Sequence, residues 1–175
     1  MSHKISLKKR SGIQGFTLLE ILLYTASATA LLLAVSIMLS VMLETRIKTE
    51  NLNELNWQGT AVMQSMTQAL RNATGINQPT LGNHDTSLSV KIADAGKDPT
   101  VFDLTGGVLY IKEGSSTKVA LSNSRFQASN LQFINLGNTS TTAAVRIEFT
   151  LACNNSSGRT EFDCSQTFVG SGSLR

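Results

Sequence analysis

The sequence predicts an α+β protein in which one very long amino-terminal helix packs against a carboxyl-terminal antiparallel β-sheet. Three observations predict this class. An apolar run of about 28 residues lies near the start, and a polar segment with one stripe of apolar side chains at helical spacing follows it. Beyond residue 75 the pattern changes to short apolar alternations separated by turn residues, which is typical of antiparallel strands. A helix first and strands afterwards is the order of an α+β fold.

The apolar run covers residues 16–43, and Glu20 is its one charged residue. As a helix it would extend about 42 Å at ~1.5 Å per residue, whereas a bilayer core is about 30 Å thick. The run is therefore long enough to span a membrane. A carboxylate at the centre of a spanning helix costs roughly 2.5–3.5 kcal/mol on insertion scales. Glu20 lies near one end of the run, where the cost is lower, but we still expect it to have a complementary partner.

Residues 44–75 continue the helix as an amphipathic segment. Its apolar stripe consists of Ile47, Leu55, Val62, Met66, Ala69 or Leu70, and Ala73, and its polar face of Glu44, Arg46, Lys48, Glu50, Glu54, Gln58, Gln64 and Arg71. Gly75 predicts a helix C-cap and Pro79 a stop. One helix of about 55–60 residues, from about Phe16 to Thr74, follows from these signals. The alternatives are two helices broken near Glu44, or a coiled coil, whose strict seven-residue seam is not evident.

Residues 76–175 predict a β-rich domain, entered through a loop over residues 75–85. The expected strands are Ser87–Ala93, Thr100–Leu104, Val108–Lys112, Lys118–Leu121, Ser129–Leu136, Ala144–Ala152 and Thr160–Val169. Thr105-Gly106-Gly107 predicts a short hairpin connection. Val145, Ile147, Phe149 and Leu151 alternate with polar residues, which indicates a half-buried strand. The small, polar tail 170–175 is expected to be loose.

The formal net charge of +3 arises from the first 15 residues, which contain Lys4, Lys8, Lys9 and Arg10 and no acid. The rest of the chain has 11 basic and 12 acidic residues, so it gives no indication of nucleic-acid binding. A basic segment before an apolar run is expected to stay in the cytoplasm by the positive-inside rule. A conventional secretory signal has a shorter apolar core and a small-residue cleavage site after it, whereas here the small residue, Gly15, comes first.

The run Gly15-Phe16-Thr17-Leu18-Leu19-Glu20, with its basic leader, resembles the signature of type IV prepilins and pseudopilins. The resemblance implies that a membrane prepilin peptidase cuts after Gly15 and methylates the new amino terminus at Phe16. It also implies a role for Glu20 in assembly, since the new amine of Phe16 lies in range of the Glu20 of a neighbouring subunit. The signature covers about a quarter of the chain. It is specific because it requires a leader, a cut site and one charge at fixed spacing from one another.

The resemblance implies a structural subunit without catalytic residues, cofactor or metal. Its expected partners are the prepilin peptidase, other pilin or pseudopilin subunits, an inner-membrane assembly platform and membrane lipid. The resulting organisation is a cleaved leader at 1–15, a membrane-spanning or filament-core helix at 16–43, its amphipathic continuation at 44–75 and an extracytoplasmic domain at 76–175. The protein would reside in the cytoplasmic membrane and then in a periplasmic or extracellular filament.

Two further details refine this placement. Major pilins usually carry a proline where this chain has Ile37, which favours a minor subunit. Residues 55–76 and the later segments Leu109-Tyr110, Asn130–Phe133 and Val145–Leu151 are similar to J-type minor pseudopilins of type II secretion. Pilus and secretion pseudopilus both remain open, and so do the roles in adhesion, motility and DNA uptake.

Cys153 and Cys164 lie 11 residues apart and, in the expected topology, outside the cytoplasm. Disulfides persist in such compartments, which favours a bond over two free thiols. A turn at residues 154–158 would bring the two cysteines onto neighbouring strands. Two thiols with one histidine after the leader, His84, and no CxxC spacing argue against a metal site.

Other chemistry has weaker signals. Asp94, Asp98 and Asp103 are oxygen ligands of the kind that calcium takes, but their spacing fits no EF-hand. His84 beside Asp85 has no nucleophile motif to serve. Trp57 is expected either at a subunit contact or in the core. The alternative function is a binding or enzymatic domain outside the cytoplasm, tethered by an uncleaved signal anchor.

Overall fold

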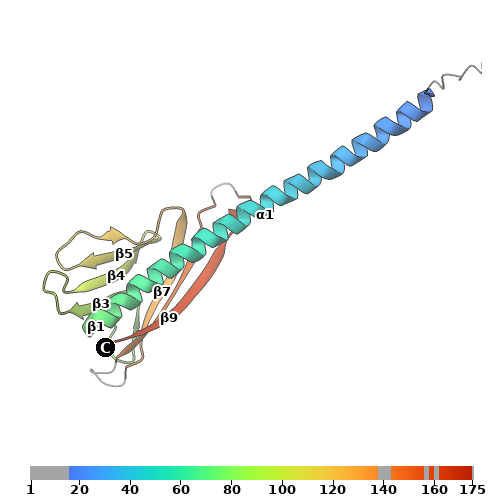
Figure 1. The fold of residues 1–175 in the computed structure, drawn as a ribbon. Helices are drawn as coiled ribbons and strands as arrows, with labels where there is room; N and C mark the ends of the chain where they lie inside the picture. Colours follow the sequence, from blue (N-terminus) through green and yellow to red (C-terminus); the bar gives the residue numbers. More distant parts are fainter. Residues whose placement is uncertain (1–15, 138–142, 156–157, 160–161, 175) are drawn as a thin grey trace, which may run out of the picture. The chain divides into compact units, whose positions relative to one another are not determined.

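The structure, a computed structural model, describes residues 16–137, 143–155, 158–159 and 162–174. The chain divides into two compact units, with the boundary between Leu43 and Glu44. One helix, α1 (Leu18–Asn72), crosses that boundary, and nine strands follow it within the described residues (Figure 1). The α+β class predicted from the sequence is therefore confirmed, and so is a single helix without a break near Glu44.

The helix begins with a local cap. The Thr17 hydroxyl accepts a hydrogen bond from the Glu20 N–H at 3.3 Å, and the Thr17 carbonyl accepts from Glu20 and Ile21 at 3.0 and 3.2 Å. Threonine three residues before glutamate is the order of a capping box, in which side chains satisfy the free amides of the first turn. Thr17 and Glu20, two residues of the predicted processing signature, thus also form the cap that starts the helix.

The strands form two antiparallel sheets, whereas the sequence suggested one. The first sheet has the order β1 (Ala73–Gln78), β3 (Leu88–Ile92), β4 (Thr100–Thr105), β5 (Val108–Glu113) and β6 (Val119–Ala120). The second has the order β2 (His84–Asp85), β7 (Phe126–Asn135), β8 (Ala144–Cys153) and β9 (Ser165–Ser173). Alternation locates strands, but it does not decide which distant strand each one pairs with.

The predicted C-cap at Gly75 is wrong, and the predicted loop over residues 75–85 holds only for residues 79–83. Helix α1 ends at Asn72, and β1 begins at the next residue and pairs with β3. Gly75 lies inside this strand at a register shift, where glycine is tolerated because a bulge relaxes the ladder. The β3 backbone supplies hydrogen-bond partners to β1 that no local signal in the sequence reveals. His84 and Asp85, also predicted as loop, pair with Ile134 and Phe133 of β7.

The connection between β4 and β5 agrees with the prediction. Thr105 pairs with Val108, so Gly106 and Gly107 alone make the turn. Their φ angles are 60° and 79°, the left-handed conformation that a two-residue hairpin of this type requires at both positions.

The core lies between the second half of α1 and the strands. Leu55, Val62, Met66 and Leu70 are buried from the helix, and Val145, Ile147, Phe149 and Leu151 are buried from β8. Both sets were predicted from periodicity. Ile47, at the start of the predicted stripe, is only half-buried.

Gln58 contradicts its predicted place on the polar face, because only 9% of it is exposed. It lies three residues after Leu55 and four before Val62, and side chains at these spacings share one face of a helix. Its Oε1 atom is buried without a hydrogen-bond partner. The helical period thus placed Gln58 in the core despite its polar side chain.

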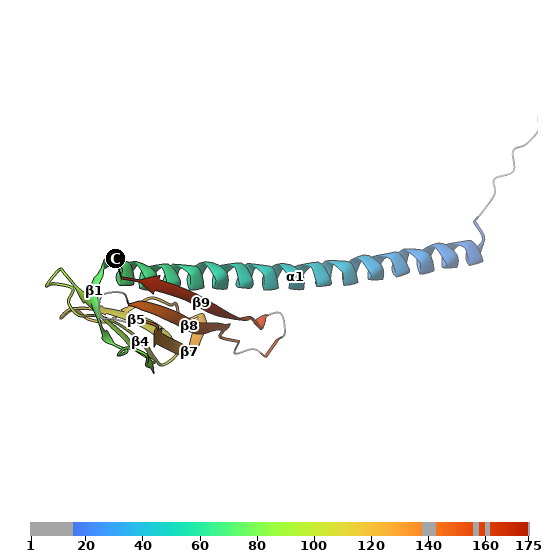
Figure 2. The same cartoon turned by 90° about the horizontal axis from the view of Figure 1, so that it is seen from below.

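Strand β9 lies against the carboxyl-terminal part of α1 (Figure 2). A Cβ atom at Gly170 would lie 2.6 Å from the Met63 sulfur, and one at Gly172 would lie 2.9 Å from Leu70 Cδ1. The prediction of a loose tail is therefore wrong for residues 170–174. Ser173 pairs with Ala144, and the Leu174 N–H donates to the Ala143 carbonyl at 3.1 Å.

Candidate functional site

The amino-terminal unit is an apolar helix that its own chain leaves uncovered. Every residue from Phe16 to Leu43 is exposed except Glu20, which is half-buried. Leu18 is 80% exposed and Leu19 75%. Within the described chain this is the one helix long and apolar enough to cross a membrane. Such a surface needs lipid or other apolar helices around it, because exposed apolar area of this size is unfavourable in water.

Four hydroxyl groups of this unit donate to backbone carbonyls within the helix. Thr25, Ser27 and Thr29 donate to backbone carbonyls three residues earlier, at 2.9 to 3.0 Å, and Ser40 donates to Ser36 at 3.1 Å. An apolar environment penalises polar groups that lack partners, and these groups have them. The polar residues of the segment are therefore compatible with lipid or with a dry helix bundle.

The residues of the predicted processing site divide between described and undescribed parts of the chain. Gly15, like the whole leader 1–15, lies outside the described residues. Phe16 is 68% exposed, and its ring centroid lies 6.2 Å from that of Tyr24 in an edge-to-face arrangement. Glu20 lies on the first turn of α1, whereas Phe16 lies two residues before the helix begins. The carboxylate thus stands four residues after the position where cleavage would create an amine.

The structure joins Cys153 and Cys164 by a disulfide, with their Cα atoms 5.1 Å apart. Cys153 ends β8 and Cys164 immediately precedes β9, and the Cys153 N–H donates to the Cys164 carbonyl at 2.8 Å. The bond therefore closes the connection between the last two strands. Cys164 is buried at the edge of the hydrophobic core.

The three candidate calcium ligands have separate partners. Asp94 accepts from the Gly96 N–H at 2.9 Å, Asp98 accepts from the Ile92 N–H at 3.2 Å, and Asp103 forms an ion pair with Lys118. Within the described ranges, no three His, Cys, Asp or Glu side chains gather closely enough to hold a metal ion.

His84 and Asp85 lie next to each other on β2, with His84 exposed and Asp85 half-buried. The Gln78 side chain donates to one oxygen of Asp85, and the Ser87 N–H donates to the other at 3.2 Å. These hydrogen bonds to the ionised form lower the pKa of Asp85, the Gln78 bond most strongly. The hydrogen bond between Gln78 and Asp85 joins the end of β1 to β2.

Trp57 lies on α1 and is 75% exposed, which excludes the core position that was one of its two predicted places.

A groove beside α1 was not predicted from the sequence. An open groove of about 850 Å³ runs between α1 and β9. Its lining residues are Thr60, Met63, Gln64, Ser65, Thr67, Gln68, Arg71, Phe168 and Val169.

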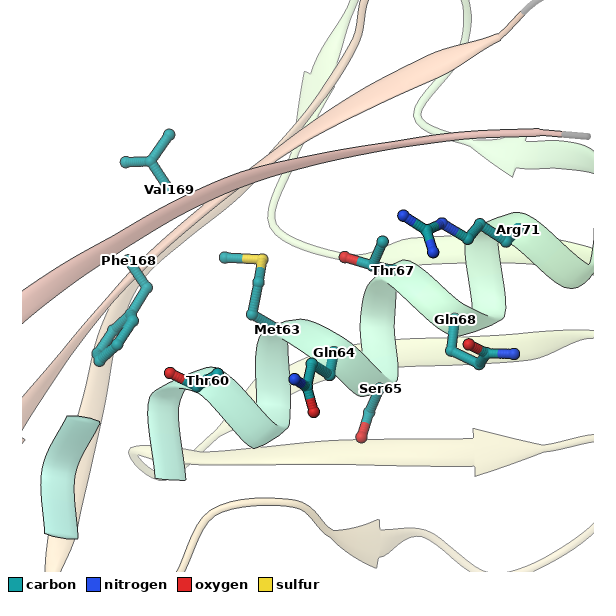
Figure 3. Close-up of a pocket in the computed structure, with 9 residues that line it drawn as sticks. All are labelled: Thr60, Met63, Gln64, Ser65, Thr67, Gln68, Arg71, Phe168 and Val169. Carbon is teal, nitrogen blue, oxygen red and sulfur yellow. The ribbon is translucent and has the colours of Figure 1, made fainter. Parts of the chain in front are cut away.

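Within this groove, Met63 points toward β9, while Gln64, Ser65 and Gln68 point away from the strand (Figure 3). Arg71 is the one titratable group among its lining residues. The groove thus offers a cation and several neutral polar groups, without the paired titratable side chains that acid–base chemistry uses. The glycines of the tail, Gly170 and Gly172, were the available signal for it, because small residues permit a close approach of helix and strand.

Comparisons with known proteins match this chain to no protein-family model, no curated protein and no solved structure. The features of the chain that bear on function are therefore the uncovered apolar helix, the position of Glu20 within it and the β-rich unit that follows.

Proposed function

We propose that this chain is a structural subunit, a minor pilin or pseudopilin, which a prepilin peptidase processes after Gly15 and which assembles through its amino-terminal helix into a filament. One observation carries the proposal. The helix exposes its whole apolar segment from Phe16 to Leu43, and its single charge stands at the fifth position after the proposed cut.

The exposed apolar segment requires apolar surroundings at every stage. A subunit first needs lipid around residues 16–43, and a filament core of like helices offers the same apolar surroundings after extraction. Glu20 is then the group whose partner differs between the unassembled and the assembled subunit. In an apolar environment the attraction between a carboxylate and an amine is strengthened, so a neighbouring subunit's Phe16 amine is a suitable partner.

The proposed binding partners of the protein follow from this sequence of membrane insertion, cleavage and assembly. The cytoplasmic membrane holds the precursor with residues 76–175 outside the cytoplasm, the prepilin peptidase cuts and methylates it, and an inner-membrane assembly platform delivers it to other pilin-like subunits. The disulfide between Cys153 and Cys164 suits an extracytoplasmic location, where such bonds persist.

The proposal is tested at the amino terminus. Mass spectrometry of protein from cells with an active prepilin peptidase should show a chain that begins with methylated Phe16. Gly15→Val should leave the full-length precursor in the membrane, because a side chain at this position blocks an extended backbone from seating in the protease.

Gly12→Val is the matched control, since it makes the same substitution within the leader but away from the cut, and it should be processed normally. Normal processing of Gly15→Val would overturn the assignment. A wild-type chain that keeps its leader in such cells would favour the alternative, an uncleaved anchor for a domain that binds or acts outside the cytoplasm.

A further inference from the structure

An open pocket of about 660 Å³ lies on the polar face of the second sheet. It is on the side of β8 opposite to the buried residues Val145, Ile147, Phe149 and Leu151, since Glu148 and Thr150 alternate with them. Its lining residues are Thr86, Leu104, Asn130, Leu131, Gln132, Glu148, Thr150 and Thr167. This volume is within the range of small-ligand sites, roughly 300–1,000 Å³.

A β-bulge shapes this pocket. Ser129 pairs with Thr150 and Gln132 pairs with Glu148, so three steps along β7 match two steps along β8. The extra residue brings Asn130, Leu131 and Gln132 into the lining together. Bulges redirect side chains in this way and recur beside functional sites.

Asn130 has a φ angle of 53°, and it is the one non-glycine residue with a positive φ in the described part of the chain. Asparagine tolerates this conformation better than most side chains, but glycine adopts it without steric cost. Backbone geometry alone would therefore favour glycine at this position. The side-chain amide, which borders the pocket, is the feature that glycine would lack.

The polar groups around the pocket converge from three neighbouring strands. Gln132 faces Glu148 across β7 and β8, and Thr150 faces Thr167 across β8 and β9, with their hydroxyls 2.9 Å apart. Two amides, three threonine hydroxyls and one carboxylate thus border one space. Amides and hydroxyls both donate and accept hydrogen bonds, so the set matches a ligand that does both.

The charge of the lining limits the class of ligand. Glu148 is its one ionisable residue, and it accepts a hydrogen bond from Arg146 at 3.2 Å, so an anion would meet a carboxylate and no cation from the lining. A metal ion would find one carboxylate where hard cations take several oxygens. Leu104 is half-buried and Leu131 is buried, so the pocket exposes little apolar area to an apolar ligand.

We propose that this pocket binds a neutral saccharide unit, with Asn130 and Gln132 and the threonine hydroxyls bonding its hydroxyl groups and Leu104 contacting its C–H face. Sugar hydroxyls are neutral groups that both donate and accept hydrogen bonds, as the groups of the lining do. This binding does not depend on the proposed role in a filament.

The test uses the full-length chain in lipid nanodiscs and saturation-transfer difference NMR, with glucose, galactose and N-acetylglucosamine as separate probes at millimolar concentration. At least one probe should give a signal above that of protein-free nanodiscs. Asn130→Gly should reduce that signal at least several-fold while the thermal unfolding temperature stays equal or rises, because glycine relieves the backbone conformation.

Thr167→Val provides a second variant that removes one hydroxyl at nearly constant volume, and it too should weaken the signal. Ser129→Ala, next to the bulge but outside the lining, is the matched control and should bind as the wild type does. The proposal fails if none of the three probes gives a signal, if both pocket variants leave the signal unchanged, or if glucuronate, an anionic sugar, binds as well as the neutral probes.

Discussion

Gly59 of α1 lies against the Cζ end of the aromatic ring of Phe168 in β9, so closely that a Cβ atom on Gly59 would overlap the ring. The same ring stacks on Phe149 of β8, with the two centroids 5.3 Å apart. Phe168 is therefore held between the helix and the sheet. Together with Gly170 and Gly172, this contact fixes the distance between α1 and the last strand.

We predict that Gly59→Ala destabilises the protein by about 1–3 kcal/mol, because an added methyl group forces Phe168 or the backbone to move. The free energy of unfolding from denaturant titration measures the effect. Gly75→Ala is the control and should change stability little, since its Cβ would lie 3.9 Å from Lys91 Cβ, an ordinary van der Waals contact.

Combining Gly59→Ala with Phe168→Leu should recover part of the loss, because the smaller side chain vacates the space that the methyl group needs. Additive losses in the double variant would show that the two residues do not share this contact.

For the disulfide, we predict that Cys153 and Cys164 are bonded in the extracytoplasmic protein and that the bond supports the last two strands. Closing a loop of this size stabilises the fold by roughly 2–3 kcal/mol in the chain-entropy model. Reduction should therefore lower the unfolding free energy of the wild type by about that amount and leave a variant with both cysteines changed to serine unaffected. Complete alkylation of both thiols in native, unreduced protein would contradict the prediction.

For the membrane segment, we predict that Glu20→Val is cleaved normally but does not enter filaments, because the amine of the neighbouring Phe16 then lacks its carboxylate in an apolar environment. Glu20→Asp should be partly active, since the charge remains but its reach is shorter. Co-purification with sheared filaments or partner subunits, scored against the level in membranes, measures incorporation.

Thr25→Val is a suitable control for Glu20→Val. It removes a side-chain hydrogen bond within the same segment without touching the charge. If Glu20→Val is incorporated as efficiently as the wild type, the carboxylate has no role in assembly.

The lowered pKa of Asp85 predicts a pH dependence of stability. A carboxyl whose pKa is lower in the folded state contributes stability above its unfolded pKa, about 3.9, and loses that contribution as the pH falls through the folded value. Stability of the wild type should therefore fall more steeply than that of Asp85→Asn as the pH drops below about 4. Thermal unfolding from pH 6 to pH 2 measures the difference.

Gln78→Ala removes the largest cause of the lowered pKa, so its acid sensitivity should lie between those of the wild type and Asp85→Asn. Identical pH profiles for all three proteins would show that the Gln78–Asp85 contact has no influence on stability.

The sequence predicted much of this architecture because its signals are local and periodic. The helical spacing of Leu55, Val62, Met66 and Leu70 located the buried face of α1, and the alternation around Val145–Leu151 located the central strand of the core. The glycine pair at 106–107 located a hairpin, since few other residues adopt its conformation. The prepilin-like signature, with Glu20 in its fixed register, likewise lies within six consecutive residues.

Features that depend on contacts between distant segments appeared only in the tertiary structure. Backbone partners from β3 turned the expected loop after the helix into β1, and pairing with β8 extended β9 into the tail at residues 170–173, which was expected to be loose. The pocket at Asn130 likewise requires a register between β7 and β8 that no local pattern encodes. The sequence by itself thus determined where the helix and most of the strands form and which segment is apolar. Long-range pairing and packing decided how the strands divide into two sheets and which side chains share a site.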